Sequence, residues 1–143
     1  MLTLNSTSVT FPAGMAKKLT FGGRVRELRL AKKLSQRELA ERVASRLKDE
    51  DRRGFDFTYL SKIENDRLPP PSTPAILALA AELGADSDEL LALAGKPPPD
   101  VGDEFRKKEG ARVFFRSATQ QNLTEAEWQR LQAYLERMRK EGK

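Results

Sequence analysis

Apolar residues along the middle of the chain recur at helical spacing. Leu39, Val43 and Leu47 lie four residues apart, with Ala40 and Ala44 beside them. Residues three or four apart share one face of an α-helix, so this pattern predicts an amphipathic helix that begins after Ser35. The other helices predicted in this region cover residues 21–33, 56–65, 73–83 and 87–95. The pattern therefore indicates an all-α fold with five helices before residue 96.

Local signals predict where several helices begin and end. Ser35–Glu38 and Thr124–Glu127 have the form of a capping box, in which the first and fourth residues bond each other's backbone N–H groups. Asp56 is placed to cap the helix that follows it. Thr73-Pro74 is expected to open the fourth helix and Gly84 to close it. These signals give the predicted helices definite boundaries.

The chain also divides into segments. Residues 1–20, rich in Ser, Thr and small residues, are expected to form a flexible arm before a domain at 21–95. Residues 96–102 (KPPPDVG) are expected to form an extended linker, because three consecutive prolines cannot continue a helix. A weaker helix is predicted over 103–118, interrupted at Gly110. We therefore predict a separate C-terminal helical segment, residues 103–143, for dimerisation or regulation.

The last predicted helix carries an apolar seam. Its residues follow at spacings of three, four and three: Trp128, Leu131, Leu135 and Met138. Such a seam is typical of a dimerisation surface, although two heptads are few, and packing against the rest of the chain is an alternative. A binding site for a different protein within 103–143 is a further alternative.

Composition excludes several function classes. The 143 residues include no histidine and no cysteine, which removes thiol and imidazole catalysis and most zinc or haem sites. We therefore predict no catalytic residue, no metal, no cofactor and no enzymatic activity. No signal peptide is evident, and no apolar run approaches the roughly 20 residues of a membrane-spanning helix. A cytoplasmic, nucleoid-associated protein is expected.

Positive charge is concentrated early in the chain. Lys and Arg number 26 against 21 for Asp and Glu, and the segment 17–53 carries a net +7 whereas 54–95 carries −5. A strongly basic face suits a phosphate-bearing partner, although solvated helix faces have the same composition.

Ordered motifs give a more specific indication. Residues 34–36 (LSQ), 38–40 (ELA) and 60–65 (LSKIEN) follow one another, and Leu83-Gly84 precedes 88–91 (DELL). In this order they resemble the Cro and phage-repressor family of helix-turn-helix regulators, also called the xenobiotic-response-element type. The resemblance covers residues 21–95 and implies a five-helix, lambda-repressor-like domain that binds double-stranded DNA.

The resemblance also implies roles for individual residues. In such domains the second helix of the motif lies in the major groove, with its first residues at base edges. The base contacts implied here are Phe57, Thr58, Tyr59 and Lys62. The phosphate contacts implied or considered are Gln36, Arg37, Asn65, Arg67, Arg52 and Arg53. Arg29 and Glu64 match a pair that forms an internal salt bridge in family members.

One departure from the family pattern concerns the turn. The family places its turn glycine almost directly after the position of Val43, whereas ten residues, Ala44–Arg53, precede Gly54 here. An extended helix with an exposed loop and a set of added phosphate contacts are both consistent with this insertion. We predict a sequence-specific regulator, a repressor that binds a palindromic operator as a homodimer. The alternative is an antitoxin or another regulator controlled by a protein bound to its C-terminal helices.

Overall fold

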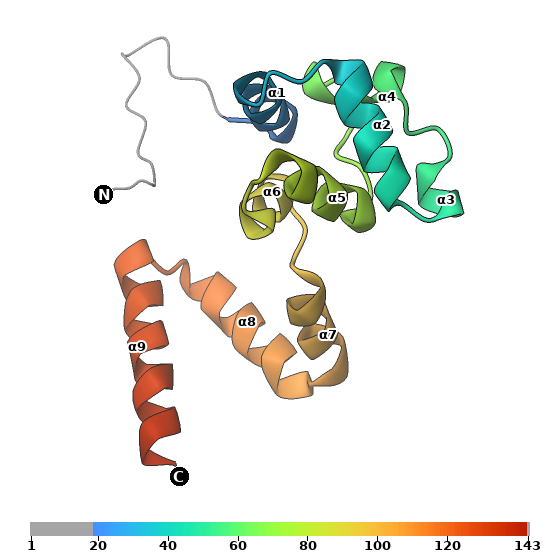
Figure 1. Ribbon diagram of the computed structural model, residues 1–143. Coiled ribbons are helices and arrows are strands. Elements are labelled where there is room, and N and C mark those ends of the chain that lie inside the picture. The colour runs from blue at the N-terminus through green and yellow to red at the C-terminus, as the bar shows by residue number, and fades with distance from the viewer. Residues whose placement is uncertain (1–18, 143) are drawn as a thin grey trace, which may run out of the picture. The chain divides into compact units, whose positions relative to one another are not determined.

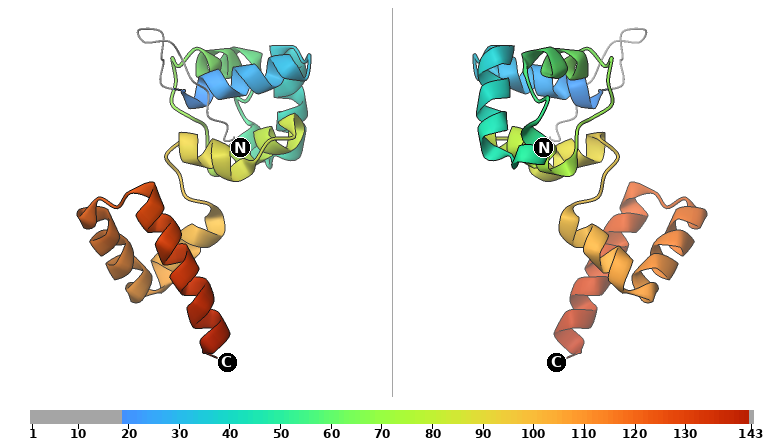
Figure 2. Two further views of the ribbon diagram at one scale, coloured as in Figure 1. Left: turned by 90° about the vertical axis from the view of Figure 1, so that its left-hand side faces the viewer. Right: turned by 90° about the vertical axis from the view of Figure 1, so that its right-hand side faces the viewer.

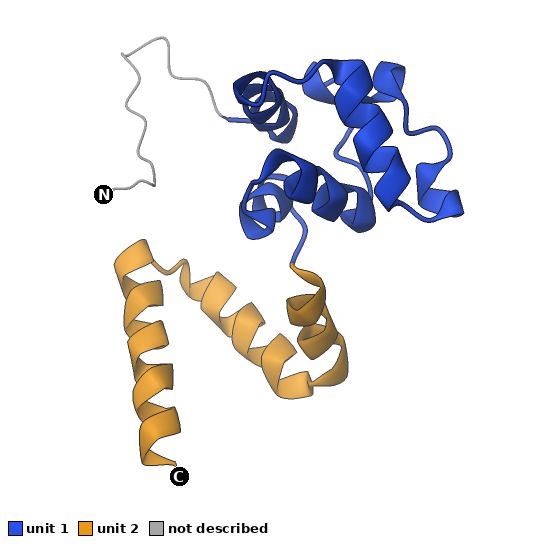
Figure 3. Cartoon of the chain, viewed as in Figure 1, with its two compact units in different colours: residues 1–97 blue, residues 98–143 orange. Residues whose placement is uncertain are grey.

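A computed structural model describes residues 19–142 of the chain (Figure 1). The described residues form nine helices and no strand, in agreement with the predicted all-α class. They divide into two compact units with a boundary between residues 97 and 98 (Figure 3). Most of the predicted flexible arm, residues 1–18, lies outside the described residues. None of the described helices is both long enough and apolar enough to cross a membrane.

The first unit is a cluster of six helices within the described residues. Their bounds are α1 Phe21–Ala31, α2 Gln36–Arg46, α3 Asp49–Arg52, α4 Phe57–Glu64, α5 Thr73–Leu83 and α6 Ser87–Leu93. Helix α5 is apolar on most sides because it packs against α1, α2 and α6 (Figure 2). Leu39, Leu60, Ile76 and Leu90 are completely buried and join the helices into one core.

The predicted caps are confirmed with one shift. Ser35 and Glu38 form both hydrogen bonds of the capping box, and the Asp56 side chain accepts from the Tyr59 N–H. Gly84 ends α5 with φ of 63°, a left-handed conformation that favours glycine. Ser72, rather than Thr73, caps the start of α5. The helix therefore begins one residue earlier than its proline suggested.

The insertion adds a helix to the predicted five. Helix α2 ends at Arg46, and the buried side chain of Leu47 anchors the chain to the core before it turns into α3. Helix α3 has three acidic residues in its first turn and Arg52 in its last, an order that suits the helix dipole. The Ser72 hydroxyl donates to the Asp51 carboxylate at 3.4 Å and ties α3 to the start of α5. The insertion is thus an ordered helical turn.

The second unit contains three helices, α7 Pro99–Lys107, α8 Glu109–Gln121 and α9 Glu125–Glu141. The prediction of an extended linker over 96–102 was too long, because Pro99 occupies the first turn of α7, where a missing N–H costs nothing. The predicted interruption at Gly110 was also misplaced. The chain is extended at Lys108 instead, and Gly110 lies inside α8. Asn122, with φ of 54°, turns the chain from α8 into α9.

The start of α1 corrects the predicted arm. Thr20 was assigned to the arm, but its side chain accepts a hydrogen bond from the Gly23 N–H at 2.9 Å and caps α1. Its hydroxyl also donates to Asp66 at 3.1 Å, just after α4. Thr20 therefore belongs to the folded unit.

Candidate nucleic-acid interface

Helix α4 has one buried face and one exposed face. Leu60, Ile63 and Glu64 point into the unit, where α4 packs against α1 and α2. Thr58 and Lys62 are exposed, and Phe57 is 38% exposed at the first position of the helix. An exposed phenylalanine beside two polar side chains gives this face both apolar and hydrogen-bonding groups.

A buried ion pair fixes α4 to α1. Arg29 Nε donates to Glu64 Oε2 at 2.7 Å, and Arg29 Nη2 donates to Glu64 Oε1 at 3.0 Å. Arg29 Nη1 also donates to the Leu34 carbonyl at 2.8 Å, in the turn before α2. The two residues expected to pair are thus joined in the bidentate geometry that suits a guanidinium and a carboxylate. Removal of one partner of such a pair costs about 3–5 kcal/mol.

Gln36 joins this network from the first position of α2. Its side-chain amide nitrogen donates to Glu64 Oε1 at 3.0 Å, and the residue is half-buried. One of its two amide N–H groups is therefore committed to the core of the motif. The backbone N–H groups at the start of α2 belong to the first turn, which has no intrahelical partners for them.

Arg37 lies against the first residue of α4. Its guanidinium carbon is 4.0 Å from the centroid of the Phe57 ring. A guanidinium stacked on a ring keeps its N–H groups free at its edges, so Arg37 can still donate to an anion. The stack places the start of α2 beside the start of α4 (Figure 1).

Comparison with known proteins identifies this arrangement. A family described as a helix-turn-helix domain matches residues 20–93. The chain belongs to this helix-turn-helix family. Residues of the chain are also similar, at 38% identity over 76 residues, to a propionyl-CoA carboxylase regulator of Cereibacter sphaeroides. The match covers 53% of this chain and 14% of that relative's length. No solved structure matches the chain significantly.

The two helices of the motif are α2 and α4, and the residues after α4 complete its surface. Asn65 and Arg67 are exposed, and the Asn65 side chain donates to the Ser61 carbonyl at 2.9 Å. Between them, Asp66 has φ of 59° and accepts the hydrogen bond from Thr20. Sequence reasoning did not single out Asp66, because its partner lies 46 residues away.

Tyr59 differs from the other expected base contacts. It is half-buried, and its ring meets the Phe55 ring edge-on with centroids 5.3 Å apart. Burial raises the pKa of the Tyr59 hydroxyl above its ordinary value. Arg53 and Pro71 line the same shallow pocket as Tyr59. The structure thus gives Tyr59 a packing role beside the insertion and leaves Phe57, Thr58 and Lys62 together on the exposed face.

Arg52 and Arg53 lie apart from that face. Helix α3 begins three residues after the end of α2, whereas Arg37 and Phe57 meet at the start of α2 (Figure 1). The 11 residues of α2 span about 16 Å at 1.5 Å per residue. Arg52 also donates to Asp49 at 2.8 Å within its own short helix. The expected phosphate contacts therefore fall into two groups at opposite ends of α2.

The predicted dimerisation residues lie in the second unit. Trp128 and Leu131 are half-buried, and the Trp128 ring lies 6.0 Å from that of Phe115 on α8. Leu135 and Met138 are exposed by 46% and 47%. The start of the seam thus packs against its own chain, and the end of the seam is exposed. Among the described residues, no group of acidic side chains is placed to hold a metal ion.

Proposed function

We propose that this chain is a sequence-specific DNA-binding regulator of transcription, a repressor that binds a palindromic operator as a homodimer. The observation that carries the proposal is the rigidly held α4, which presents Phe57, Thr58 and Lys62 on one exposed face. Membership of the helix-turn-helix family and a relative named as a regulator support the same function. No catalytic role is needed for it.

Each residue on this face suits a different feature of the major groove. The Lys62 ammonium can donate to guanine O6 or N7. The Thr58 hydroxyl can donate or accept, and its methyl group can contact a thymine methyl. The Phe57 ring offers a larger apolar surface to a thymine methyl. Tyr59 contributes a base contact only at the edge of this surface, since its ring packs on Phe55.

Backbone contacts on both sides of α4 would fix its position in the groove. At the start of α2, Arg37 and the first-turn N–H groups, with the second amide N–H of Gln36, suit one phosphate strand. Asn65 and Arg67 suit the other side, just beyond the end of α4. Because such contacts carry no sequence information, they orient the helix and leave the choice of bases to its exposed face.

One short helix reads few base pairs, which is why the proposal includes a second copy. Two copies related by a two-fold axis would place two α4 helices in successive major grooves, about 34 Å apart, on a palindromic site. Binding across a promoter would exclude polymerase and repress transcription. This step accounts for the repressor and homodimer parts of the proposal.

The test begins with selection of a preferred site from random duplex DNA by the full chain. Lys62→Ala should then weaken binding to that site by about 1–3 kcal/mol and relax the preference at one base pair. Arg67→Ala is the matched control, because loss of a phosphate contact weakens selected and random DNA equally. An equal loss on both DNAs for Lys62→Ala would refute the base contact. Failure to select any site would refute sequence-specific binding.

A further inference from the structure

The second unit has almost no core of its own. Among residues 98–142, Ala118 is the buried apolar residue, whereas Val113, Phe114, Leu135 and Met138 are each at least 44% exposed. A helical unit this small needs disulfides, a metal or association to supply the missing burial. The chain has no cysteine, and its described residues offer no metal cluster. Association remains.

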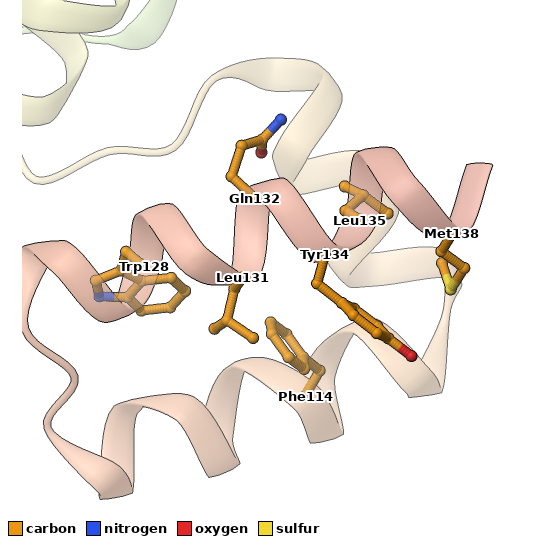
Figure 4. A pocket seen from close by; sticks show the side chains of 7 residues that line it. All are labelled: Phe114, Trp128, Leu131, Gln132, Tyr134, Leu135 and Met138. Atoms are coloured by element: carbon orange, nitrogen blue, oxygen red, sulfur yellow. The ribbon is translucent and has the colours of Figure 1, made fainter. Parts of the chain in front are cut away.

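The exposed apolar side chains border one groove. Helices α8 and α9 diverge from the turn at Asn122, as both Figure 1 and Figure 2 show. The groove between them has a volume of about 400 Å³ and is lined mostly by apolar residues. In Figure 4, Phe114 of α8 points toward Leu131 and Tyr134 of α9. An open apolar groove between two helices is a site for a third helix.

We propose that this groove is filled by α9 of a second copy of the chain, in antiparallel orientation. The seam spacing of three, four and three reads the same in both directions. A two-fold axis near residue 133 therefore pairs Trp128 with the partner's Met138 and Leu131 with the partner's Leu135. All four seam residues face apolar partners in this single register, and the sulfur of Met138 meets an aromatic ring.

The charges that border the seam favour the same orientation. On one side, Glu125 lies opposite the partner's Arg139, and Gln132 lies opposite its own copy at the axis. In a parallel pair, the helix-bordering positions would instead bring Glu127 beside Gln132 and Tyr134 beside Arg139, which joins no opposite charges. On the other side of the antiparallel pair, Glu127 lies opposite the partner's Glu141. That like-charge contact gives a distinctive test.

The inference deepens the homodimer of the proposed function and rests on that function only for the purpose of the dimer. Sizing measurements test the dimer without DNA, and binding measurements test the function without assuming how the dimer forms. Failure of one is therefore distinguishable from failure of the other.

The first experiment is sedimentation equilibrium of the full chain over a range of concentrations. Wild-type protein should dimerise, and Leu135→Glu should raise the dimer dissociation constant at least tenfold, because it buries an unpaired carboxylate in the seam. Ala133→Glu is the matched control. It adds the same charge to α9 on the face opposite the seam, and it should leave the constant unchanged. A monomeric wild type, or equal effects of the two variants, would overturn the proposal.

Charge exchange tests the orientation. Arg139→Glu should weaken the dimer about fivefold, since each dimer contains the contact twice, and added Glu125→Lys should restore it. Glu141→Lys alone should strengthen the dimer by replacing a repulsion with an attraction to the partner's Glu127. A parallel or unrelated interface predicts neither the rescue nor the strengthening, so their absence would exclude the antiparallel register.

The final arm separates the dimer from the proposed function. Leu135→Glu should bind a single half-site as the wild type does, and it should lose the tighter binding to the two-fold palindrome. A dimeric wild type that binds no DNA would retain the interface and exclude the DNA-binding function. Half-site binding that falls together with dimerisation would contradict the separation of the two units' roles.

Discussion

Gly22 lies where α1 crosses the end of α4, and the crossing leaves no room for a side chain. A Cβ at this position would be 2.0 Å from the Ile63 carbonyl oxygen and 2.8 Å from an Asp66 carboxylate oxygen. The carbonyl belongs to the backbone of α4, so a side chain could be accommodated only if one helix moved. Gly22 thus sets how closely the exposed helix is held to α1.

We expect Gly22→Ala to destabilise the folded unit by about 3 kcal/mol, at the upper end of overpacking changes. Urea denaturation followed by circular dichroism measures the change as a lower midpoint. Gly23→Ala is the neighbouring control, because its Cβ would meet only the Thr20 hydroxyl oxygen, at 3.1 Å. It should change the stability by less than about 1 kcal/mol. Equal effects at the two positions would show that close packing at Gly22 is unimportant.

At the scale of elements, helix starts were the best predicted feature of the sequence. A capping box depends on residues three apart, so Ser35 and Glu38 contain all the information that their interaction requires. Pro99 misled for the opposite reason. A run of prolines stops a preceding helix, but its last member is also a good first residue for the next, and the following sequence decides between them.

The candidate interface was predictable in outline and not in detail. The ordered motifs predicted that α4 would be the exposed helix, and Arg29 and Glu64 were expected to meet from the family pattern. The position of Tyr59 was not predictable, because Phe55 and the ten-residue insertion decide which side of α4 is covered. The stack of Arg37 on Phe57 joins two elements across that same insertion.

The α2 capping box makes a prediction about pH. Hydrogen bonds from the Ser35 backbone and side chain hold the pKa of Glu38 below its ordinary value of 4.5. A carboxylate with a lowered folded pKa stabilises the fold above its unfolded pKa, and this contribution is lost as the pH falls through the folded value. We therefore expect Glu38→Gln to reduce the loss of thermal stability between pH 6 and about pH 3.

The control for this measurement is Glu41→Gln. It removes the same charge from an exposed position of the same helix and leaves the cap intact. Thermal unfolding of both variants and the wild type at each pH makes the comparison. Parallel behaviour of Glu38→Gln and the wild type would show that the cap does not contribute to acid sensitivity.

At the scale of the whole molecule, charge and apolar surface are divided between the two units. The basic segment 17–53 includes α1 and α2, which frame the exposed helix, whereas exposed apolar side chains gather on α8 and α9. A basic frame acts at long range and depends on salt, and an apolar groove acts only on contact. The two proposed partners, DNA and a second copy, are therefore recognised by different forces in different units.

That division predicts how salt should act on DNA binding. Each lost phosphate contact should lower the slope of log affinity against log salt by about 0.9. We expect such a decrease for Arg37→Ala and for Arg67→Ala on a straight operator. The double variant R52A/R53A should leave the slope unchanged, because α3 lies at the far end of α2 from the Arg37–Phe57 stack. Arg106→Ala, in α7, is the control for a charge lost away from the interface. A decrease of about 1.8 for the double variant would instead show that the insertion contacts DNA, and the operator would have to bend to reach it.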